Sequence, residues 1–427
     1  MELNEMIMIS VDDHVVEPPH MFDGRLPAKY VDQAPKVIRN DMGDDVWTYN
    51  GAIIPNIGLN AVAGRPKTEY GIEPTSFSEM RSGCYDIHER VKDLSAGGVL
   101  AAMCFPSFPA FSGRLFVAEN DHEMSAAMVR AYNDWHIDEW CGTYPDRHIP
   151  MIIPMLWSPD ETAAEILRCA AKGCHSLTFT ENPAALGLPS FHSDYWDPIW
   201  KALVDTDSVL NIHLGSSGKL AVTAPDAPMD VMITLQPMNI CMAAADLVWS
   251  RVFREFPTLK VALSEGGTGW IPYFLDRLDR TYDMHHAWTG QDFGSQLPSD
   301  IFRQHILTCF INDPVGLQHL EDIGVNNVCW EQDYPHSDSS WPFAPDELHT
   351  QAALYGVSDA YLNQITHENA MRWYHFDPFK IRPRERCTVG ALRAEAAGHD
   401  VSEKAYSTGR RERSQISLGE LAANANA

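Results

Sequence analysis

Residues 148–180 read HIPMIIPMLWSPDETAAEILRCAAKGCHSLTFT and contain one complete strand–helix–strand pattern. The runs His148–Met155 and His175–Thr180 are hydrophobic on both faces, which is typical of strands in a covered parallel sheet. Between them a helical pattern opens at Ser158, which is placed as an N-cap before a proline, and closes at Gly173. This unit predicts a parallel α/β fold.

The same pattern recurs along the rest of the chain. Six further apolar runs have the length and composition of buried strands: Ile7–Asp12, Val99–Phe105, Val209–His213, Lys260–Glu265, His305–Ile311 and Asn327–Glu331. Helical patterns cover Asp121–Tyr144 and Thr268–Tyr282. Eight strands with intervening helices predict an α/β fold of the distorted (β/α)8 TIM barrel type. The alternative is an open doubly wound sheet.

Two segments do not follow this repeat. We predict one barrel domain over residues 1–379, with a large insertion at 16–85 after the first strand. The insertion is rich in Pro, Gly and Asn and contains one strand-like piece, Val46–Ile54. Residues 380–427 hold nine Lys or Arg against six Asp or Glu, unlike the acidic remainder. We interpret them as a polar C-terminal extension, either mobile or an arm onto a neighbouring subunit.

The composition limits the class of protein. A net charge of −26 over 427 residues argues against nucleic acid or an anionic membrane as the main partner. No apolar run reaches the roughly 20 residues of a membrane-spanning helix, and the N-terminus lacks a signal-peptide pattern. Nine scattered cysteines without a CxxC pair predict free thiols in a reducing compartment. We expect a cytoplasmic protein that takes a small-molecule substrate and forms homo-oligomers, or hetero-oligomers with a related subunit.

Imidazole and carboxylate side chains gather at the predicted ends of the strands. In a barrel of this kind the reacting groups lie at the C-terminal ends of strands. The residues concerned are Asp12, His14, Glu181, His213, Glu265, Asp333 and His336. Because Asp12 and His14 are two positions apart on an extended chain, their side chains point the same way. A convergent set of these groups suits a divalent metal such as Zn, Mn or Fe.

Five segments resemble a known family: ISVDDHVVEPPHMF (9–22), NIHLGSS (211–217), ALSEGGTGWIPYFLDRLDR (262–280), WEQDYPHSDSSWP (330–342) and THENAMRWYHF (366–376). The chain resembles the amidohydrolase-related family. This is the branch of the amidohydrolase superfamily that includes aminocarboxymuconate-semialdehyde and hydroxybenzoate decarboxylases. The resemblance extends over residues 7–376, and it implies a distorted (β/α)8 barrel with a metal in its mouth.

The resemblance also implies roles for individual residues. The metal-ligand set that it implies is Asp12, His14, His213 and Asp333. Asp12 replaces the first His of the usual H-x-H pair, and Asp333 matches an aspartate that binds metal and accepts a proton from its water. Glu265 stands where many relatives carry a catalytic His. The base is therefore expected at Glu265 itself or at His336.

The implied reaction is hydrolysis or non-oxidative decarboxylation of a small organic acid, amide or lactone, through a metal-bound water or a metal-chelated substrate. One metal ion is expected; a second would need Glu181 and Glu265 as further ligands. Two His and four carboxylates resemble oxygen-rich di-iron or iron–manganese centres, so a dinuclear Fe/Mn oxygenase is an alternative. A non-catalytic, metal-bearing partner subunit is a second alternative. Arg25, Arg65 and Arg81 of the insertion are candidates to bind a substrate carboxylate.

Overall fold

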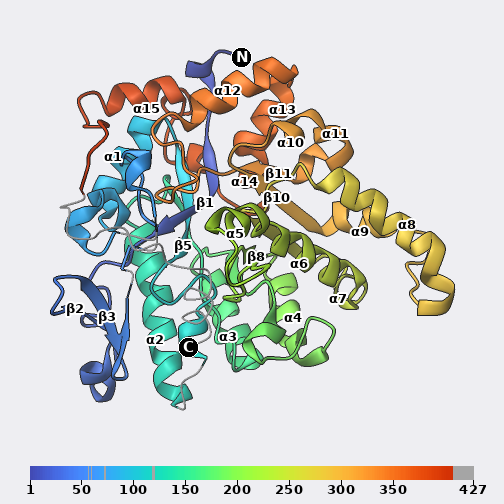
Figure 1. Ribbon diagram of the computed structural model, residues 1–427, viewed down its shortest axis with the longest axis horizontal. Coiled ribbons are helices and arrows are strands. Elements are labelled where there is room, and N and C mark those ends of the chain that lie inside the picture. The colour runs from blue at the N-terminus through green and yellow to red at the C-terminus, as the bar shows by residue number, and fades with distance from the viewer. Residues whose placement is uncertain (56, 59, 72–73, 118–120, 407–427) are drawn as a thin grey trace.

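The computed structural model describes residues 1–55, 57–58, 60–71, 74–117 and 121–406. Parallel strands lie at the centre of the molecule, and helices surround them (Figure 1). In ring order the eight central strands are β1 (Ile9–Val15), β5 (Ala101–Pro106), β6 (His148–Ile149), β7 (Ser176–Phe179), β8 (Val209–His213), β9 (Lys260–Ser264), β10 (Ile306–Phe310) and β11 (Val328–Trp330). Each of them falls on a predicted strand.

Two junctions join the sheet β1–β5–β6 to the sheet β7–β11 and complete the ring. The backbone hydrogen bonds at these junctions run from Ile152 N to Ser176 O (3.0 Å), Thr178 N to Ile152 O (2.9 Å), Asp333 N to Asp12 O (2.9 Å) and His14 N to Tyr334 O (2.7 Å). A doubly wound sheet has no contact between its first and last strands, so the barrel is the correct prediction. It is distorted because isolated hydrogen bonds, and not ladders, make the two junctions. β6 ends at Ile149 because Pro150 has no N–H group to donate.

Helices follow the strands around the ring. They are α1 (Ile87–Gly97), α2 (His122–Trp135), α3 (Pro159–Ala170), α4 (Asp197–Asp205), α5 (Met229–Leu235), α6 (Met238–Trp249), α7 (Val252–Glu255), α8 (Ile271–Thr289), α9 (Pro298–His305), α10 (Pro314–Gln318), α11 (Leu320–Ile323), α12 (Ala344–Tyr355), α13 (Asp359–Asn363), α14 (Asn369–Trp373) and α15 (Val389–Glu395). α3 begins as predicted, because the Ser158 hydroxyl accepts a hydrogen bond from Glu161 N. α8 is longer than predicted, and its C-terminal half projects from the body of the molecule (Figure 1).

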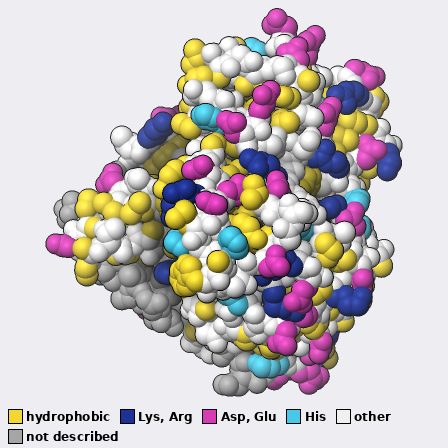
Figure 2. Space-filling model, turned by 90° about the vertical axis from the view of Figure 1, so that its right-hand side faces the viewer, with side chains coloured by type: hydrophobic (Ala, Val, Ile, Leu, Met, Phe, Trp, Pro, Cys, Tyr) yellow, Lys and Arg dark blue, Asp and Glu magenta, His cyan; other side chains and the backbone are white. Residues whose placement is uncertain are grey.

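The core lies between the ring and the outer helices. Its largest buried side chains on the β7–α4 side are Phe179, Phe191, Trp196 and Trp200, whose rings contact one another. On the face that carries α8, acidic, basic and hydrophobic side chains are interspersed (Figure 2). Burial of these aromatic side chains on the outer face of the sheet fixes the strands and leaves their carboxyl ends free to carry polar groups.

The insertion after β1 contains a small antiparallel sheet of β2 (Lys36–Arg39), β3 (Asp45–Tyr49) and β4 (Ala52–Ile54). The single strand predicted at Val46–Ile54 is therefore wrong. Asn50 and Gly51 both have positive φ, 48° and 77°, and form a tight turn between β3 and β4. An Asn-Gly pair is a strong hairpin signal because both residues tolerate this conformation.

Residues 380–406 pack against the rest of the chain. α15 contacts α1, Lys404 N donates to Gly64 O (2.8 Å), and an Arg81 Nη donates to Asp400 O (2.9 Å). These contacts argue against mobility of 380–406, and an arm onto a neighbouring subunit stays a prediction. Residues 407–427 lie outside the described residues, and the domain boundary at 379 stays a prediction.

One stretch, Met229–Trp249, is long and apolar enough to cross a membrane by length and composition alone, in the part of the chain that the structure describes. It consists of α5 and α6, and it contains Asp230 and Asp246, so it does not appear as an uninterrupted apolar run in the sequence. One such stretch is weak evidence, since a core helix of a soluble protein passes the same test. The inner face of α6 packs against β9.

Candidate metal centre

Four predicted residues meet at the mouth of the barrel. Asp12, His14, His213 and Asp333 are fully buried at the ends of β1, β8 and β11. Nε2 of His14 lies 3.5 Å from Asp12 Oδ1, 3.1 Å from Asp333 Oδ1 and 3.2 Å from His213 Nε2. Nε2 of His213 lies 3.5 Å from Asp12 Oδ2. Donor atoms at these separations are spaced like the ligands of one ion with bonds of about 2.1 Å.

Several of these donor atoms have no hydrogen-bond partner. Both carboxylate oxygens of Asp12 and both of Asp333 are buried and make no hydrogen bond with a described residue. Burying unpaired polar atoms costs several kcal/mol, so they need a partner of another kind. A divalent cation would satisfy carboxylate and imidazole donors together. The donor set therefore fits such an ion.

The ring of His213 is oriented for this purpose. Its Nδ1 donates to Leu214 O (2.5 Å), which leaves Nε2 with a free lone pair facing Asp12 and His14. Burial lowers the pKa of His213 to about 3, so the imidazole stays neutral, as a metal ligand must. The Phe111 ring lies 4.2 Å from the His213 ring and packs against it.

The two acidic residues that were predicted to move protons have unusual backbone geometry. Glu265 has a φ of 60° and Asp333 a φ of 54°, in the left-handed region that side chains other than glycine rarely adopt. Such conformations cost about 1–3 kcal/mol and cluster at functional sites. At the next position, a Cβ on Gly266 would lie 2.5 Å from Ile240 of α6, so glycine is required where that helix approaches β9.

Glu265 and His336 lie at the edge of the donor set. Glu265 Oε2 is 3.4 Å from His213 Nε2, and its side chain is 15% exposed, whereas that of His213 is fully buried. The His336 ring stacks on His14 with ring centroids 3.7 Å apart, and its Nδ1 lies 3.0 Å from Asp333 Oδ1. Both residues can reach a molecule bound above the donor atoms.

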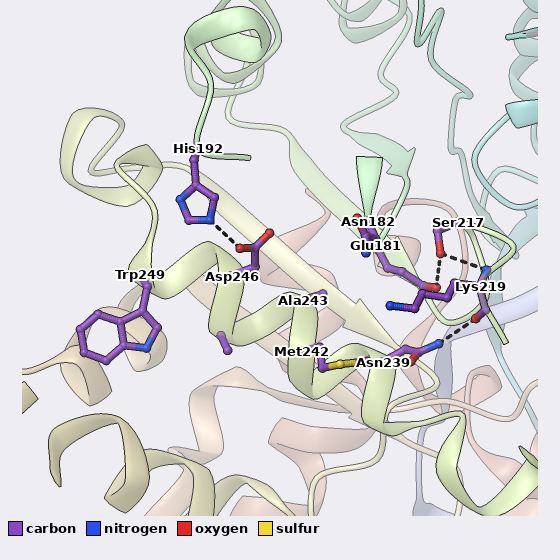
Figure 3. A pocket seen from close by; sticks show the side chains of 11 residues that line it. Glu181, Asn182, His192, Ser217, Lys219, Asn239, Met242, Ala243, Asp246 and Trp249 are labelled. Carbon is purple, nitrogen blue, oxygen red and sulfur yellow. Dashed lines mark hydrogen bonds and ion pairs between the residues drawn. The ribbon is translucent and has the colours of Figure 1, made fainter. Parts of the chain in front are cut away.

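Glu181 is the predicted residue that lies apart from the others. Its Oε1 accepts a hydrogen bond from the Ser217 hydroxyl (2.7 Å), and burial raises the pKa of Glu181 to about 7. It faces a cavity of about 510 Å³ between the loops after β7 and β8 and helix α6 (Figure 3). The remaining wall includes Lys219, Met242 and Trp249. The cavity is large enough for a small organic molecule.

Sequence reasoning gave no role to Glu331. It is fully buried, its Oε2 accepts a hydrogen bond from Glu265 N (3.3 Å), and burial raises its pKa to about 7. The signal was present, because Glu331 and Asp333 are two positions apart and follow the same alternation as Asp12 and His14. The electrostatic contribution of Glu331 helps to raise the pKa of Asp12, Glu265 and Asp333.

A second missed residue, Arg90 of α1, fixes the end of β1 from outside the barrel. Its Nη1 lies 3.4 Å from Asp13 Oδ2, its Nε donates to Gly83 O (2.6 Å), and an Nη donates to His14 O. Arg90 and Asp13 are both fully buried. The pair thereby holds the backbone between Asp12 and His14.

We expect Arg90→Met to lower the free energy of unfolding by about 3–5 kcal/mol, because it leaves Asp13 buried without its counter-charge. The measurement is urea unfolding of the metal-free protein. Adding Asp13→Asn to the same chain is expected to restore part of the loss, since the unpaired charge is then removed. A single variant as stable as the wild type would show that Asp13 is not charged in the folded protein.

The crowded carboxyls also predict how the stability of the metal-free protein depends on pH. Burial and mutual repulsion raise the pKa of Asp12, Glu265 and Asp333. Glu331 shows the direction of the effect, because its pKa rises from 4.5 to about 7 on folding. Its contribution to stability is complete below pH 4.5 and is lost as pH rises through about 7. The metal-free protein should therefore lose stability across this window.

A metal ion must displace those protons, so it binds more tightly as pH rises. We expect the increase in Tm caused by MnCl2 to be larger at about pH 7.5 than at about pH 5.5. Thermal unfolding with and without the metal measures this difference. An increase of the same size at both pH values contradicts the assignment of these carboxyls to the ion.

The three arginines of the insertion that were candidates to bind substrate have protein partners. Arg25 pairs with Glu139, and Arg65 donates to a backbone carbonyl. Arg81 pairs with Asp93 (2.6 Å) beneath the C-terminal segment. They are therefore engaged in holding the insertion together.

Comparison with known proteins places the chain in a family. The amidohydrolase family model matches residues 44–376, so the chain belongs to the amidohydrolase family. The family and the enzyme class predicted from the sequence are confirmed. The match begins after β1, so Asp12 and His14 lie outside the matched residues. No curated protein matches the chain.

Solved structures share the fold. An amidohydrolase from Mycobacterium avium subsp. paratuberculosis K-10 has 19% identity and a TM-score of 0.67, over 86% of this chain and 99% of that one. The 5-carboxyvanillate decarboxylase of Sphingomonas paucimobilis has 19% identity and a TM-score of 0.61, over 87% and 99%. A dihydroxybenzoic acid decarboxylase from Polaromonas sp. JS666, solved with manganese and 2-nitroresorcinol, has 17% identity and a TM-score of 0.58, over 88% and 98%.

Proposed function

We propose that the protein is a metal-dependent decarboxylase or hydrolase of a small organic acid. The observation that carries this proposal is the buried donor set, in which carboxylate and imidazole atoms lie 3.1–3.5 Å apart while the Asp12 oxygens lack partners. Asp12, His14, His213 and Asp333 would hold the ion. Bound there, the ion would polarise a substrate carboxylate or carbonyl, or lower the pKa of a water.

The chain's own residues would move the proton. Glu265 lies beside His213 and is partly exposed, and burial raises its pKa, which favours its protonated form. Asp333 and His336, 3.0 Å apart, form a second route for a proton. Glu181 faces the cavity and would contact the part of the substrate that extends away from the ion.

Decarboxylation of an aromatic acid is the reaction we favour. Several solved structures with this fold are decarboxylases of hydroxylated or methoxylated benzoates, and the Polaromonas enzyme was solved with manganese and an aromatic inhibitor. In that reaction a carboxylic acid side chain must deliver a proton to the ring carbon that loses CO2. The Glu265 side chain is 15% exposed, so it can contact a bound substrate, and burial raises its pKa, which favours the acid form.

A dinuclear oxygenase remains the second candidate, and one observation favours it. The Glu265 carboxylate lies 3.4 Å from His213 Nε2, so three carboxylates and three imidazoles surround one space when His336 is included. Sets that combine carboxylates with imidazoles also suit iron or manganese pairs. Glu181 would be a further ligand if its side chain turned from Ser217 toward the barrel axis.

Elemental analysis of the purified protein separates these two candidates. About one manganese or zinc per chain supports the decarboxylase or hydrolase, and release of CO2 from hydroxybenzoates is then assayed together with hydrolysis of amides and lactones. Two irons, or iron with manganese, support the oxygenase, for which oxygen consumption is the assay. A protein that binds no divalent metal would contradict both.

A further inference from the structure

Arg114 lies in a loop at the barrel mouth, and its side chain has no partner among the residues that the structure describes. It follows Gly113 in the loop after β5 and is partly buried. Its guanidinium makes no hydrogen bond or ion pair with a residue that the structure describes. Arginines with restricted access to water normally have carboxylate or carbonyl partners, as Arg25, Arg65 and Arg81 have. Arg114 is therefore a cation available to a ligand.

The loop that carries Arg114 is held beside the candidate metal centre. The Ser112 hydroxyl donates to Ser216 O (3.0 Å), which ties this loop to the loop after β8. The ring of Phe111, three residues before Arg114, packs on His213 with ring centroids 4.2 Å apart. Contacts on the same short segment thus hold the loop of Arg114 next to His213.

A second cation, Lys219, follows Gly218, the residue against which Arg114 packs. Gly218 has a φ of 73°, and a Cβ at this position would lie 2.2 Å from Arg114 Nη1, so the guanidinium packs closely against this loop. The next residue, Lys219, is exposed and lines the cavity near Glu181 (Figure 3). The Lys219 ammonium has no ion pair within the described parts of the chain.

The surroundings of these cations are acidic. Four buried carboxyl groups and one partly exposed one lie at the mouth: Asp12, Glu181, Glu331 and Asp333 are buried, and Glu265 is partly exposed. Glu181 acts on Arg114 electrostatically, but the two side chains are not within ion-pair distance of each other. Glu181 Oε1 accepts from Ser217, and its Oε2 makes no hydrogen bond with a described residue. An anionic substrate would be repelled by so many carboxyls unless a fixed positive charge received it.

Beyond the cations the cavity wall becomes apolar. Met242, Ala243 and Trp249 of α6 line it (Figure 3). A ligand that spans the cavity would therefore meet Lys219 near Glu181 and hydrocarbon surface along α6, with Arg114 behind the loop of Gly218. This arrangement suits an organic anion with an apolar body.

We propose that Arg114 is a specificity-determining residue that binds a substrate carboxylate remote from the reacting group. Lys219 adds a second positive charge, and the apolar body of the substrate contacts α6. The inference rests on the proposed function, because it places the substrate between Arg114 and the metal ligands. The planar guanidinium offers two parallel N–H donors that match a carboxylate. The substrate class is an organic acid with an anionic group besides the group that reacts.

The test compares two probes by calorimetry on the full-length, manganese-loaded protein: benzene-1,3-dicarboxylate and 3-carbamoylbenzoate. The second has one carboxylate replaced by a neutral amide of similar size. We expect the wild type to bind the dicarboxylate about tenfold more tightly, as one charge-assisted hydrogen-bonded contact allows. Arg114→Gln should abolish this preference. Arg280→Gln, at an exposed position on α8, is the matched control and should retain it.

Arg114→Lys is a second, more conservative variant, which keeps the test valid if Arg114→Gln does not fold. Lysine keeps the charge without the paired donors, so the preference should fall without disappearing. Equal affinity of the wild type for both probes, or a preference unchanged in either Arg114 variant, overturns the proposal. Failure of the proposed function gives a different result: the wild type takes up no metal, while the preference for the dicarboxylate is still measured in the metal-free protein.

Discussion

His213→Ala is expected to remove the bound metal and with it all measurable turnover, while the fold survives. Nε2 of His213 lies 3.2 Å from His14 Nε2 and 3.5 Å from Asp12 Oδ2, so its loss opens one side of the donor set. Loss of a residue that only orients a ligand weakens metal binding about 10–100-fold, and loss of a ligand itself should cost more. Metal content by elemental analysis should therefore fall below a tenth of the wild-type value.

The fold should survive because His213 stabilises its own surroundings little. Its ring packs on Phe111 and Phe105, but its nitrogens have few protein partners besides Leu214 O. His175→Ala is the matched control, since His175 directly precedes β7, at the end of that strand away from the mouth, and its Nδ1 donates to Thr206 O (3.0 Å). Circular dichroism should match the wild type for both variants. Full metal content and turnover in His213→Ala would overturn the site assignment.

Sequence periodicity predicts the strands of this barrel because they are buried on both faces. Every residue of β1, β5, β7 and β8 is buried, so the apolar runs are nearly continuous and their ends are sharp. The predicted strand ends are wrong where a proline or a tight turn interrupts the hydrogen bonding of the backbone. Pro150 ends β6 early, and the turn at Asn50–Gly51 divides one predicted strand into two.

The donor set was predictable for the same reason. Asp12 and His14 come from one strand end, and the barrel directs all strand ends to one mouth. Residues that reach the site from loops carry no such signal. Arg90 contacts Asp13 from 77 positions along the chain, and Arg114 reaches Gly218 across the mouth. Only the tertiary structure brings such pairs together.

Residues 380–406 show the limit of composition as a guide. Their polar composition suggested mobility, but polar groups can hold a segment in place when their partners are fixed. His399 Nε2 lies 2.7 Å from Asp93 Oδ1, and Asp93 also accepts from Arg81 and from the Tyr334 hydroxyl (2.6 Å). Tyr334 directly follows Asp333, so this network reaches the strand that carries a candidate metal ligand.

Glu265→Gln should lower kcat about 10²–10⁴-fold while the metal content stays at the wild-type level, if Glu265 transfers the proton. The amide has the same shape and can occupy the position beside His213, but it cannot give or take a proton near neutral pH. The substitution also removes one of the mutually repelling carboxyls. The metal-free variant should therefore be more stable than the wild type at about pH 8, where the native carboxyl is forced toward its charged form.

The two roles of Glu265 are separated by measuring metal and turnover on the same preparation. Glu368→Gln, at an exposed position, is the matched control and should change neither. Wild-type turnover in Glu265→Gln would exclude it as the acid or base and leave Asp333 with His336 as the route for the proton. A large fall in metal content would instead make Glu265 a ligand and raise the number of carboxylates on the metal, which favours the oxygenase. The strained φ of 60° would then serve to place its carboxylate within the donor set.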